Sequence, residues 1–356
     1  MDKYIHAFNL VWGISYQALR MIDRGFVSWK YAWDKAEEGD FARVGLSEEL
    51  ARKIVEQRKK IDVGEEHEKI IKSGVNLVGR GCEEFPFILK QVADPPFLIY
   101  RKGAPLGKDF VGIAIVGTRM PSRYGEGVAR DISKMVTECG GVVVSGLAFG
   151  IDAVSHRAAV NLGRPTVAVL ASGVNHVTPA SHIKLADAII EKGGTVISEY
   201  PGDTATFNYR FLARNRIISG LSKATIVIEA KERSGALITA RHALDQDRDV
   251  YALVGDISRP QARGCLDIIG KDEARPIVNL DNLIEELGFD RKGAQLKLMD
   301  DKAVDIVGCL KKKALSLDEI SRFSGIATHE LMTQLSLLEL KKLVSQNRFG
   351  KWELTK

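Results

Sequence analysis

Residues 117–119, Gly-Thr-Arg, follow a short apolar run and precede a stretch that can form a helix. A loop between a strand and a helix often binds phosphate, because backbone N–H groups and the positive end of the helix dipole meet there. A dinucleotide site needs the spacing G-x-G-x-x-G, in which the second glycine admits the pyrophosphate. Arg119 holds that position and offers a bidentate guanidinium instead. The loop therefore favours a nucleic-acid phosphate over a dinucleotide cofactor.

Two further features argue against common nucleotide sites. The acid that binds the ribose of NAD would stand near Ser145, at the end of the second expected strand. The sequence also lacks the G-x-x-x-x-G-K-[S/T] motif of P-loop hydrolases. We therefore expect no bound cofactor.

A second glycine-rich loop spans residues 145–152. Gly146 and Gly150 allow the backbone to approach a ligand closely. Asp152 and His156 lie one turn apart in the helix expected to follow. Asp152 then either caps this helix while His156 packs in the core, or both residues take part in catalysis.

Residues 207–216 combine three arginines with three aromatic residues. Aromatic rings stack on unpaired bases, at ~1–3 kcal/mol for each base, and arginines follow the phosphate backbone. This pattern indicates single-stranded rather than duplex nucleic acid. Alternatively, the rings belong to the core and the arginines lie on the surface or bridge to Glu199 and Glu229.

Ser234 and Gly235 begin a further expected helix. Small residues at a helix N-terminus leave room for an anion. Close packing of the helix on the sheet is the other interpretation.

An α/β domain at residues 106–290 is expected to position these groups. Short apolar strands alternate with stretches long enough for helices, which predicts a Rossmann-like parallel sheet covered on both faces. Loops at the carboxyl ends of such strands share one edge of the sheet, where ligands bind. The expected strands are residues 113–116, 142–144, 166–170, 195–198, 225–229 and 249–253.

Residues 1–105 predict a mostly helical domain, SAM-like or helix-hairpin-helix-like. The turns at residues 12–14 and 44–46 have a glycine between apolar residues, and each is followed by an N-cap candidate, Ser15 or Ser47. These hairpins either pack as a helical unit or touch DNA through their turns. Short strands are expected at 75–78 and 97–100, and a linker at 103–109.

Residues 300–356 predict a winged helix, which is three helices followed by a β-hairpin. The first helix is expected at 303–312, and the lysines at 311–313 are interpreted as its solvated end. Ser316 and Glu319 form a capping box for the second helix. Thr328 caps the third after a turn at Gly325, and the hairpin follows at 343–354.

Composition permits a polyanionic partner without demanding one. The 356 residues carry a net charge of +5 and have a pI near 8.9. An apolar run of the ~18 residues that cross a bilayer is missing, as is a signal peptide, so we expect a cytoplasmic protein. The cysteines are scattered singly, which predicts reduced thiols and no metal site. Motifs of serine hydrolases and zinc proteases are absent, so we do not expect an enzyme.

The sequence resembles the DNA processing protein A (DprA/Smf) family in five motifs whose joint order and spacing are specific. They are Val-Gly-Thr-Arg-x-x-Ser-x-Tyr-Gly at 116–125, Ser-Gly-Leu-Ala-x-Gly-Ile-Asp at 145–152, Ser-Glu-Tyr at 198–200, Phe-x-x-Arg-Asn-Arg-Ile-Ile-x-Gly-Leu at 211–221 and Glu-Ala-x-x-x-Ser-Gly-x-Leu-Ile-Thr-Ala at 229–240.

This resemblance implies a non-catalytic protein of natural transformation. Such a protein binds and shields single-stranded DNA and helps to load the recombinase RecA, usually as a dimer formed through its Rossmann-like domain. Phe149 and Asn208 stand where family members often carry a basic residue. From the motifs and the resemblance together, the expected DNA-binding residues are Gly117, Thr118, Arg119, Ser122, Gly146, Arg210, Phe211, Arg214, Asn215, Ser234 and Gly235.

Two other functions fit parts of the sequence. A nucleotide-binding or nucleotide-cleaving Rossmann-like enzyme or sensor could use Gly235 with Glu229. A regulator could instead bind duplex DNA through the winged helix.

Overall fold

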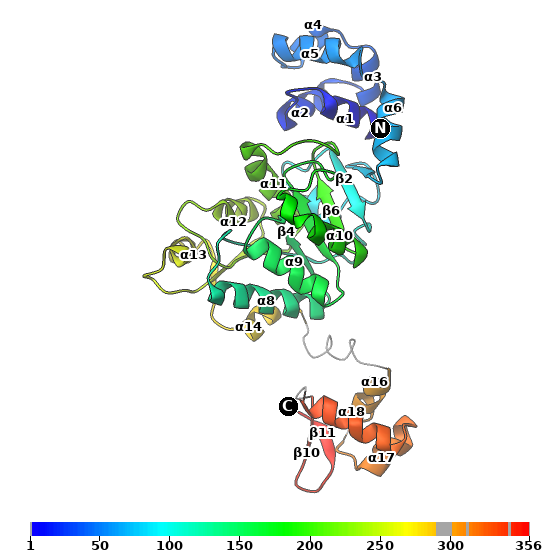
Figure 1. Ribbon diagram of the computed structural model, residues 1–356, viewed down its shortest axis with the longest axis vertical. Helices are drawn as coiled ribbons and strands as arrows, with labels where there is room; N and C mark the ends of the chain where they lie inside the picture. The colour runs from blue at the N-terminus through cyan, green and yellow to red at the C-terminus, as the bar shows by residue number, and fades with distance from the viewer. Residues whose placement is uncertain (1, 290–300, 311–312, 341–342, 356) are drawn as a thin grey trace. The chain divides into compact units, whose positions relative to one another are not determined.

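The computed structural model describes residues 2–289, 301–310, 313–340 and 343–355 (Figure 1). Contacts within the chain divide it into two compact units. The first comprises Met1–Thr137 and Gly141–Leu283, and the second comprises Glu138–Gly140 and Ile284–Lys356. Two of the three lysines expected to end a helix, at 311 and 312, lie outside the described residues.

The chain begins with the predicted helical segment. Ser15 accepts a hydrogen bond from the Ala18 N–H at 3.1 Å, and Ser47 accepts one from the Leu50 N–H at 3.3 Å, so both predicted N-caps are confirmed. The turns before them contain Gly13 at φ +88° and Gly45 at φ +100°, a region that glycine adopts readily. The helices are α1 Asp2–Leu10, α2 Tyr16–Gly25, α3 Trp29–Asp34, α4 Glu38–Arg43, α5 Glu48–Arg58 and α6 Val63–Lys72.

A nine-stranded sheet follows, in the order β1-β2-β6-β5-β4-β3-β7-β8-β9. The strands from β3 to β9 pair in parallel, as predicted. The short strands predicted at 75–78 and 97–100 are confirmed, but they pair antiparallel at the edge of this sheet beside β6, although the sequence assigned them to the helical domain. The strands are β1 Asn76–Gly79, β2 Leu98–Gly103, β3 Gly112–Val116, β4 Val142–Ser145, β5 Thr166–Leu170, β6 Thr195–Ser198, β7 Ala224–Val227, β8 Asp249–Leu253 and β9 Arg275–Ile277.

Helices cover both faces of this sheet (Figure 1). In β5, Val167 and Val169 pack with residues of α11 and α12, whereas Ala168 and Leu170 pack with residues of α9, α10 and the N-terminal helices. This alternation follows from the two-residue period of a strand. The helices of this part are α7 Phe87–Lys90, α8 Arg123–Glu138, α9 Ile151–Asn161, α10 Ile183–Glu191, α11 Asn208–Gly220, α12 Gly235–Asp245, α13 Pro260–Gly270 and α14 Leu280–Glu286.

The second unit has the predicted winged helix. Ser316 and Glu319 form the expected capping box, and Gly325 ends the helix in a left-handed conformation, at φ +71°. The isolated bridge between Leu315 and Trp352 adds a third extended segment to the hairpin. Its elements are α16 Asp301–Leu310, α17 Leu317–Ser324, α18 Thr328–Leu340, β10 Val344–Gln346 and β11 Trp352–Leu354. Within the described ranges, no helix has the length and apolar character to span a membrane.

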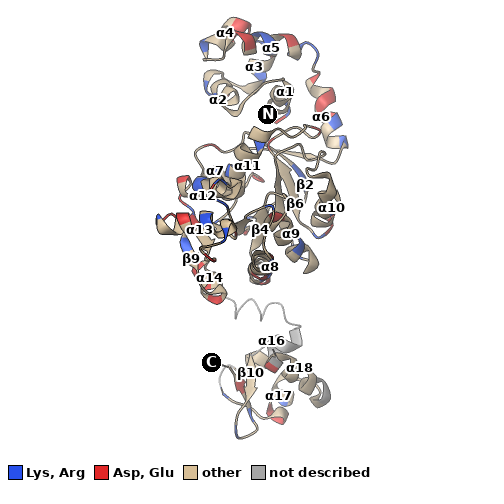
Figure 2. Ribbon diagram, turned by 60° about the vertical axis from the view of Figure 1, so that its left-hand side comes forward, with Lys and Arg blue, Asp and Glu red and all other residues tan. Residues whose placement is uncertain are grey.

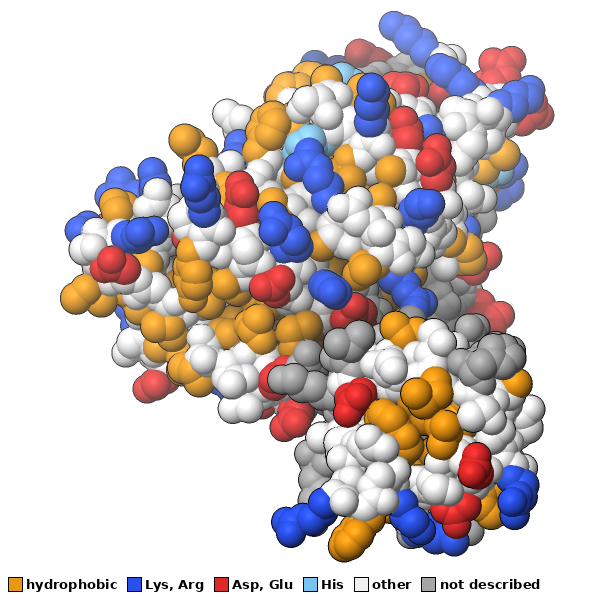
Figure 3. Space-filling view, turned by 60° about the horizontal axis from the view of Figure 1, so that its bottom comes forward, with side chains coloured by type: hydrophobic (Ala, Val, Ile, Leu, Met, Phe, Trp, Pro, Cys, Tyr) orange, Lys and Arg blue, Asp and Glu red, His pale blue; other side chains and the backbone are white. Residues whose placement is uncertain are grey.

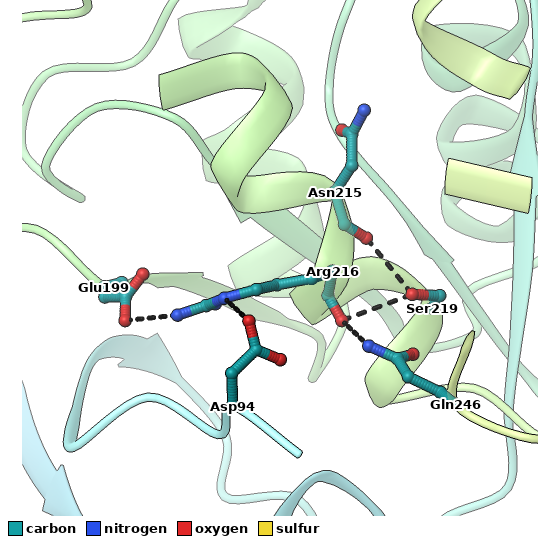
Figure 4. Close-up of polar contacts among 6 residues, drawn as sticks. All are labelled: Asp94, Glu199, Asn215, Arg216, Ser219 and Gln246. Carbon is teal, nitrogen blue, oxygen red and sulfur yellow. Dashed lines mark hydrogen bonds and ion pairs between the residues drawn. The ribbon is translucent and has the colours of Figure 1, made fainter. Parts of the chain in front are cut away.

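Arg216 of α11 connects segments that lie far apart in the chain (Figure 4). Its Nη2 lies 2.7 Å from the Glu199 carboxylate, and its Nε lies 3.0 Å from the Asp94 carboxylate. The guanidinium also lies 5.1 Å from the centre of the Tyr16 ring. Burial opposes the charge, but the two carboxylates raise the pKa of Arg216 above its usual value. The sequence analysis offered, as an alternative to DNA contact, that arginines of residues 207–216 bridge to Glu199 and Glu229. For Arg216, the bridge to Glu199 is confirmed.

We expect the substitution Arg216→Met to lower the free energy of unfolding by about 3 kcal/mol or more, because it leaves the largely buried Glu199 without its counter-charge. Urea denaturation measures this change. Arg241→Met is the matched control, because Arg241 pairs with Asp245 and Glu273 on the surface. Its cost should stay below about 1 kcal/mol. Equal costs for the two variants would contradict the assignment.

Candidate nucleic-acid interface

Strand β3 lies where the order of the sheet reverses. It is flanked by β4 and β7. The chain runs from β3 outward through β4, β5 and β6, and then returns through α11 to β7 on the other side. In open α/β sheets, ligands bind at the carboxyl ends of the strands at this reversal. The loops after β3 and β7 are therefore the place to look for a site.

A cavity of about 420 Å³ opens at this position. Residues from the loops after β3, β4 and β7 and from the first turns of α11 and α12 line it. Eight of the eleven predicted DNA-binding residues are among them, namely Gly117, Thr118, Arg119, Phe211, Arg214, Asn215, Ser234 and Gly235.

The loop of residues 117–119 is held by backbone hydrogen bonds. The Thr118 N–H donates to the Glu229 carbonyl at 2.7 Å, and the Ile151 N–H donates to the Thr118 carbonyl at 3.2 Å. Gly150 has φ +75°, and a Cβ on it would lie 2.3 Å from that Thr118 carbonyl oxygen. The glycine thus permits the close approach of the two loops. The Thr118 N–H is thus bonded within the protein, and the loop presents the Arg119 guanidinium as a donor to an anion.

The exposed Arg119 side chain stands over an aromatic ring. Its guanidinium carbon lies 5.2 Å from the centre of the Phe211 ring. A cation–π contact of this kind orients a guanidinium while leaving its edge accessible. Lys231 and Arg233, also exposed, line the same cavity. Figure 2 shows basic segments close together near the labels α12 and α13.

The predicted motifs do not single out Lys231 and Arg233. Both fall within six residues after the end of β7, whose position beside β3 only the sheet order reveals. A search for basic residues after each expected strand is the signal that would have found them. Asn208 and Leu212 of α11 line the cavity as well.

Arg214 lies buried beneath the cavity. Its Nη1 donates to the Gly146 carbonyl at 2.8 Å and to the Val169 carbonyl, and its Nε donates to Asn215 Oδ1 at 3.2 Å. Burial lowers the pKa of Arg214 to about 10, while the charge of Asp152 opposes this shift. The side chain therefore remains a cation at neutral pH.

Gly146, predicted to approach DNA, instead makes room for Arg214. It is buried and does not line the cavity, and a Cβ on it would lie 2.6 Å from the guanidinium. The sequence motif marks a close approach correctly, but the approaching group belongs to the protein itself.

Asp152 and His156 serve the structure. The Asp152 carboxylate accepts hydrogen bonds from the Gly146 and Ala148 N–H groups, at 3.1 and 3.3 Å, so it binds the preceding loop, and Gly150 holds the N-cap position of α9. His156 Nδ1 lies 2.9 Å from the Thr166 hydroxyl. Burial lowers the pKa of His156 to about 3, so the ring is neutral and packs in the core. Packing is therefore observed for His156, whereas the predicted helix cap by Asp152 is wrong, because its carboxylate binds the loop before the helix.

Ser122, another expected DNA-binding residue, is bonded inside the protein and does not line the cavity. Its N–H and its hydroxyl both donate to the Glu229 carboxylate, at 2.8 and 2.6 Å. Ser122 directly precedes α8, so this carboxylate occupies the anion position at the start of that helix. Motif spacing could not show this contact, because 107 positions separate the two residues.

The start of α12 is open to the cavity. Ser234 caps the helix by accepting from the Ala236 N–H at 3.3 Å, and Gly235 follows as an exposed first residue. A Cβ on Gly235 would meet no atom within 4 Å. The positive end of this eleven-residue helix therefore faces the same space as Arg119. Of the two sequence interpretations, the anion site is the one that this geometry favours.

Arg210, another expected DNA-binding residue, is not among the residues that line the cavity. Its Nη1 donates to the Ala205 carbonyl at 2.8 Å, and its guanidinium lies 4.3 Å from the centre of the Tyr200 ring and 4.9 Å from that of Phe207. These contacts hold it beside the cavity, on the surface formed by the start of α11.

The described ranges hold no group of three or more His, Cys, Asp or Glu side chains that could hold a metal ion. The cavity brings together exposed cations, a helix N-terminus and an aromatic ring. Such a set is suited to an anionic ligand with an aromatic part.

Two family models match the chain. The model of DNA recombination-mediator protein A matches residues 76–288, and that of the DprA winged helix domain matches residues 290–347. The DNA processing protein DprA of Bacillus subtilis is 40% identical over 215 residues, which are 60% of this chain and 72% of the relative. Protein Smf of Escherichia coli is 34% identical over 276 residues, which are 74% of each chain.

Solved structures agree with this match. The structure of DprA from Streptococcus pneumoniae has a TM-score of 0.68 at 29% identity and covers 82% of this chain and 99% of its own. A structure of DprA from Helicobacter pylori, described as showing a single-stranded DNA binding mode, has a TM-score of 0.54 at 25% identity, with 61% and 99% covered. With the sheet, the cavity and the winged helix arranged as described, the chain belongs to the DNA processing protein A (DprA/Smf) family.

Proposed function

We propose that this protein binds single-stranded DNA in the cavity at the reversal of the sheet. The observation that carries the proposal is the convergence of three exposed cations, Arg119, Lys231 and Arg233, with the open start of α12 around one cavity. Cations at such a rim neutralise phosphates, and the helix N-terminus adds N–H donors. The described binding mode of the Helicobacter pylori relative supports the same ligand.

The size of the cavity supports a single strand. A volume of about 420 Å³ matches that of a small-molecule site, so it accepts a phosphate with its neighbouring sugar or base. A duplex keeps its bases stacked inside, where Phe211 could not reach them. We therefore expect preference for unpaired DNA.

We propose a binding protein rather than an enzyme. Asp152 lines the cavity, but its carboxylate is buried and accepts from the Gly146 and Ala148 N–H groups, and the buried His156 ring is bonded to Thr166. Glu229 is likewise bonded to Ser122. Because these three groups are already engaged within the protein, they support a binding role.

A homodimer formed through the Rossmann-like domain is part of the proposal. A second hollow, of about 370 Å³, lies at the ends of β7 and β8 and is lined by Tyr124, Val254 and Ala262, among others. Beside it, Ile257 is 80% exposed. Figure 3 shows apolar side chains gathered on the α13 side of the first unit. Exposed apolar side chains gathered around a hollow are suited to a second copy of the chain.

We further propose that the bound strand is passed to RecA. Support comes from the family, whose model is named for a recombination mediator. A mediator must hold single-stranded DNA firmly enough to protect it and release it to a competing filament. Binding based mainly on phosphate contacts, which is salt-dependent and indifferent to sequence, meets that requirement.

The substitution Arg119→Ala should weaken binding of oligo-dT by about tenfold, because it removes a charge-assisted contact to phosphate. Fluorescence anisotropy measured over a range of salt concentrations should also show the slope of log K against log salt reduced by about 0.7. Arg123→Ala is the control, because Arg123 is an exposed arginine of the same segment that does not line the cavity.

Two results would contradict single-strand binding in this cavity. One is wild-type affinity for duplex DNA equal to that for oligo-dT. The other is displacement of oligo-dT by mononucleotides at concentrations similar to those of the oligonucleotide, which would favour a nucleotide sensor.

The substitution Ser234→Asp should separate folding from binding. Aspartate is as good an N-cap as serine, so the thermal midpoint should stay unchanged or rise. The added charge, however, repels a phosphate at the start of α12 by about 1 kcal/mol even in water, or roughly fivefold in affinity. Anisotropy and thermal unfolding of the same sample measure both effects. Retained affinity would remove the α12 terminus from the site.

The dimer is tested with Ile257→Glu, which we expect to sediment as a monomer where the wild type sediments as a dimer. Phe87→Glu, at another exposed apolar residue, is the control and should leave the dimer intact.

Transfer of the strand to RecA is tested by adding the wild-type protein to RecA and to oligo-dT that is coated by a single-strand-binding protein. Wild-type protein should speed the onset of ATP hydrolysis by RecA, and absence of any acceleration would contradict loading.

A further inference from the structure

Three aromatic side chains lie exposed next to the cavity. Trp12 is 68% exposed, Tyr209 is 62% exposed and Phe207 is 41% exposed. The rings of Phe207 and Tyr209 are stacked with centroids 6.0 Å apart, and the Trp12 ring meets Phe207 edge-on at 6.3 Å. We call these three residues, with Arg210, the aromatic surface. It joins the turn after α1 to the start of α11.

Trp12 differs from its counterpart in the second hairpin. Both turns place an apolar residue before a glycine, and in the second turn this residue is Val44. Val44 packs so closely on the neighbouring helix that a Cβ on Gly25 would lie 2.2 Å from its Cγ1. The Trp12 side chain instead projects into solvent, although its backbone N–H donates a 3.0 Å hydrogen bond to Gln57 Oε1. Packing of the helices therefore uses the apolar Val44 before Gly45, whereas it does not use the apolar Trp12 before Gly13.

Arg210 gives this surface a positive charge. Its guanidinium lies within 6 Å of the ring centres of Tyr200, Phe207 and Tyr209. Exposed rings interleaved with arginine are the arrangement by which proteins hold unpaired bases and their phosphates without reading sequence. Asn208 and Leu212, on the same turns of α11, line the cavity, so the surface and the cavity are continuous.

We propose that DNA leaving the cavity stacks its bases on the aromatic surface, so that the N-terminal helical segment contributes Trp12 to the DNA path. This inference rests on the single-strand binding proposed above and extends it to a second, stacking subsite. It also specifies how the first hairpin touches DNA, which is through the indole ring and not through backbone amides of the turn. A duplex cannot use this subsite, because its bases are already stacked on one another.

Tryptophan fluorescence tests the contact directly. The chain has four tryptophans, and Trp29, Trp33 and Trp352 are at most 7% exposed. Stacking of a base on Trp12 should therefore quench the solvent-exposed component of the emission when oligo-dT is added. We expect this quenching in the wild type and its loss in Trp12→Phe, which keeps a ring for stacking and should retain oligo-dT affinity.

Affinity provides the second measurement. Trp12→Ala should weaken binding of an oligo-dT of about 16 nucleotides by about fivefold or more, and leave one of about 4 nucleotides unaffected, since the short strand fills the cavity alone. The salt slope should not change, because no phosphate contact is lost. Tyr31→Ala, which removes another exposed ring of the helical segment, is the control and should bind like the wild type.

These outcomes distinguish the two proposals. Failure of the wild type to bind oligo-dT would remove the function itself. The stacking subsite alone would be overturned if the wild type binds oligo-dT and Arg119→Ala weakens this binding as predicted, but the wild type shows no quenching and Trp12→Ala has no effect. Equal weakening of short and long strands by Trp12→Ala, with a lowered thermal midpoint, would also overturn it, because Trp12 would then act by holding the helical segment in place.

Discussion

The cavity depends on the buried cation of Arg214. A charge taken out of water is strongly destabilising unless hydrogen bonds and an opposite charge compensate it. Here the carbonyls of Gly146 and Val169, at the carboxyl ends of β4 and β5, accept from its guanidinium, and Asp152 supplies the counter-charge. Asp152 in turn holds the N–H groups of the loop after β4. The floor of the site is thus fixed before any ligand arrives.

Helix α11 carries both the structural and the ligand-facing groups. Its first turns hold Asn208, Phe211 and Leu212 at the cavity, whereas its second half, from Arg214 onward, is buried. Arg214 reaches the ends of the central strands, and Arg216, two positions later, reaches Glu199 and Asp94. Such different partners are possible because residues two apart on a helix point in different directions. The Phe211 ring, which lies under Arg119, is therefore held in place by the buried contacts that Arg214 and Arg216 make from the same helix.

Local features of the sequence were sufficient for much of the fold and for part of the site. The run of residues 166–170 is short, apolar and β-branched, and it forms β5 at those bounds. Ser15 and Ser47 cap helices because an N-cap needs only its own next three residues. Arg119 was predictable from the loop that carries it. What local patterns cannot show is pairing across the chain, such as Ser122 with Glu229, or the joining of residues 76–103 to the sheet.

These non-local contacts decide where an anion can bind. Two helix starts, of α8 and α12, lie near the reversal of the sheet, and both are suited to a phosphate on the basis of sequence alone. Glu229 places its carboxylate at the start of α8, where it takes both donors of Ser122. The start of α12 lines the cavity beside Arg119, Lys231 and Arg233. An internal carboxylate thus occupies the start of α8, and the basic side chains around the start of α12 give that terminus the positive field that suits a phosphate.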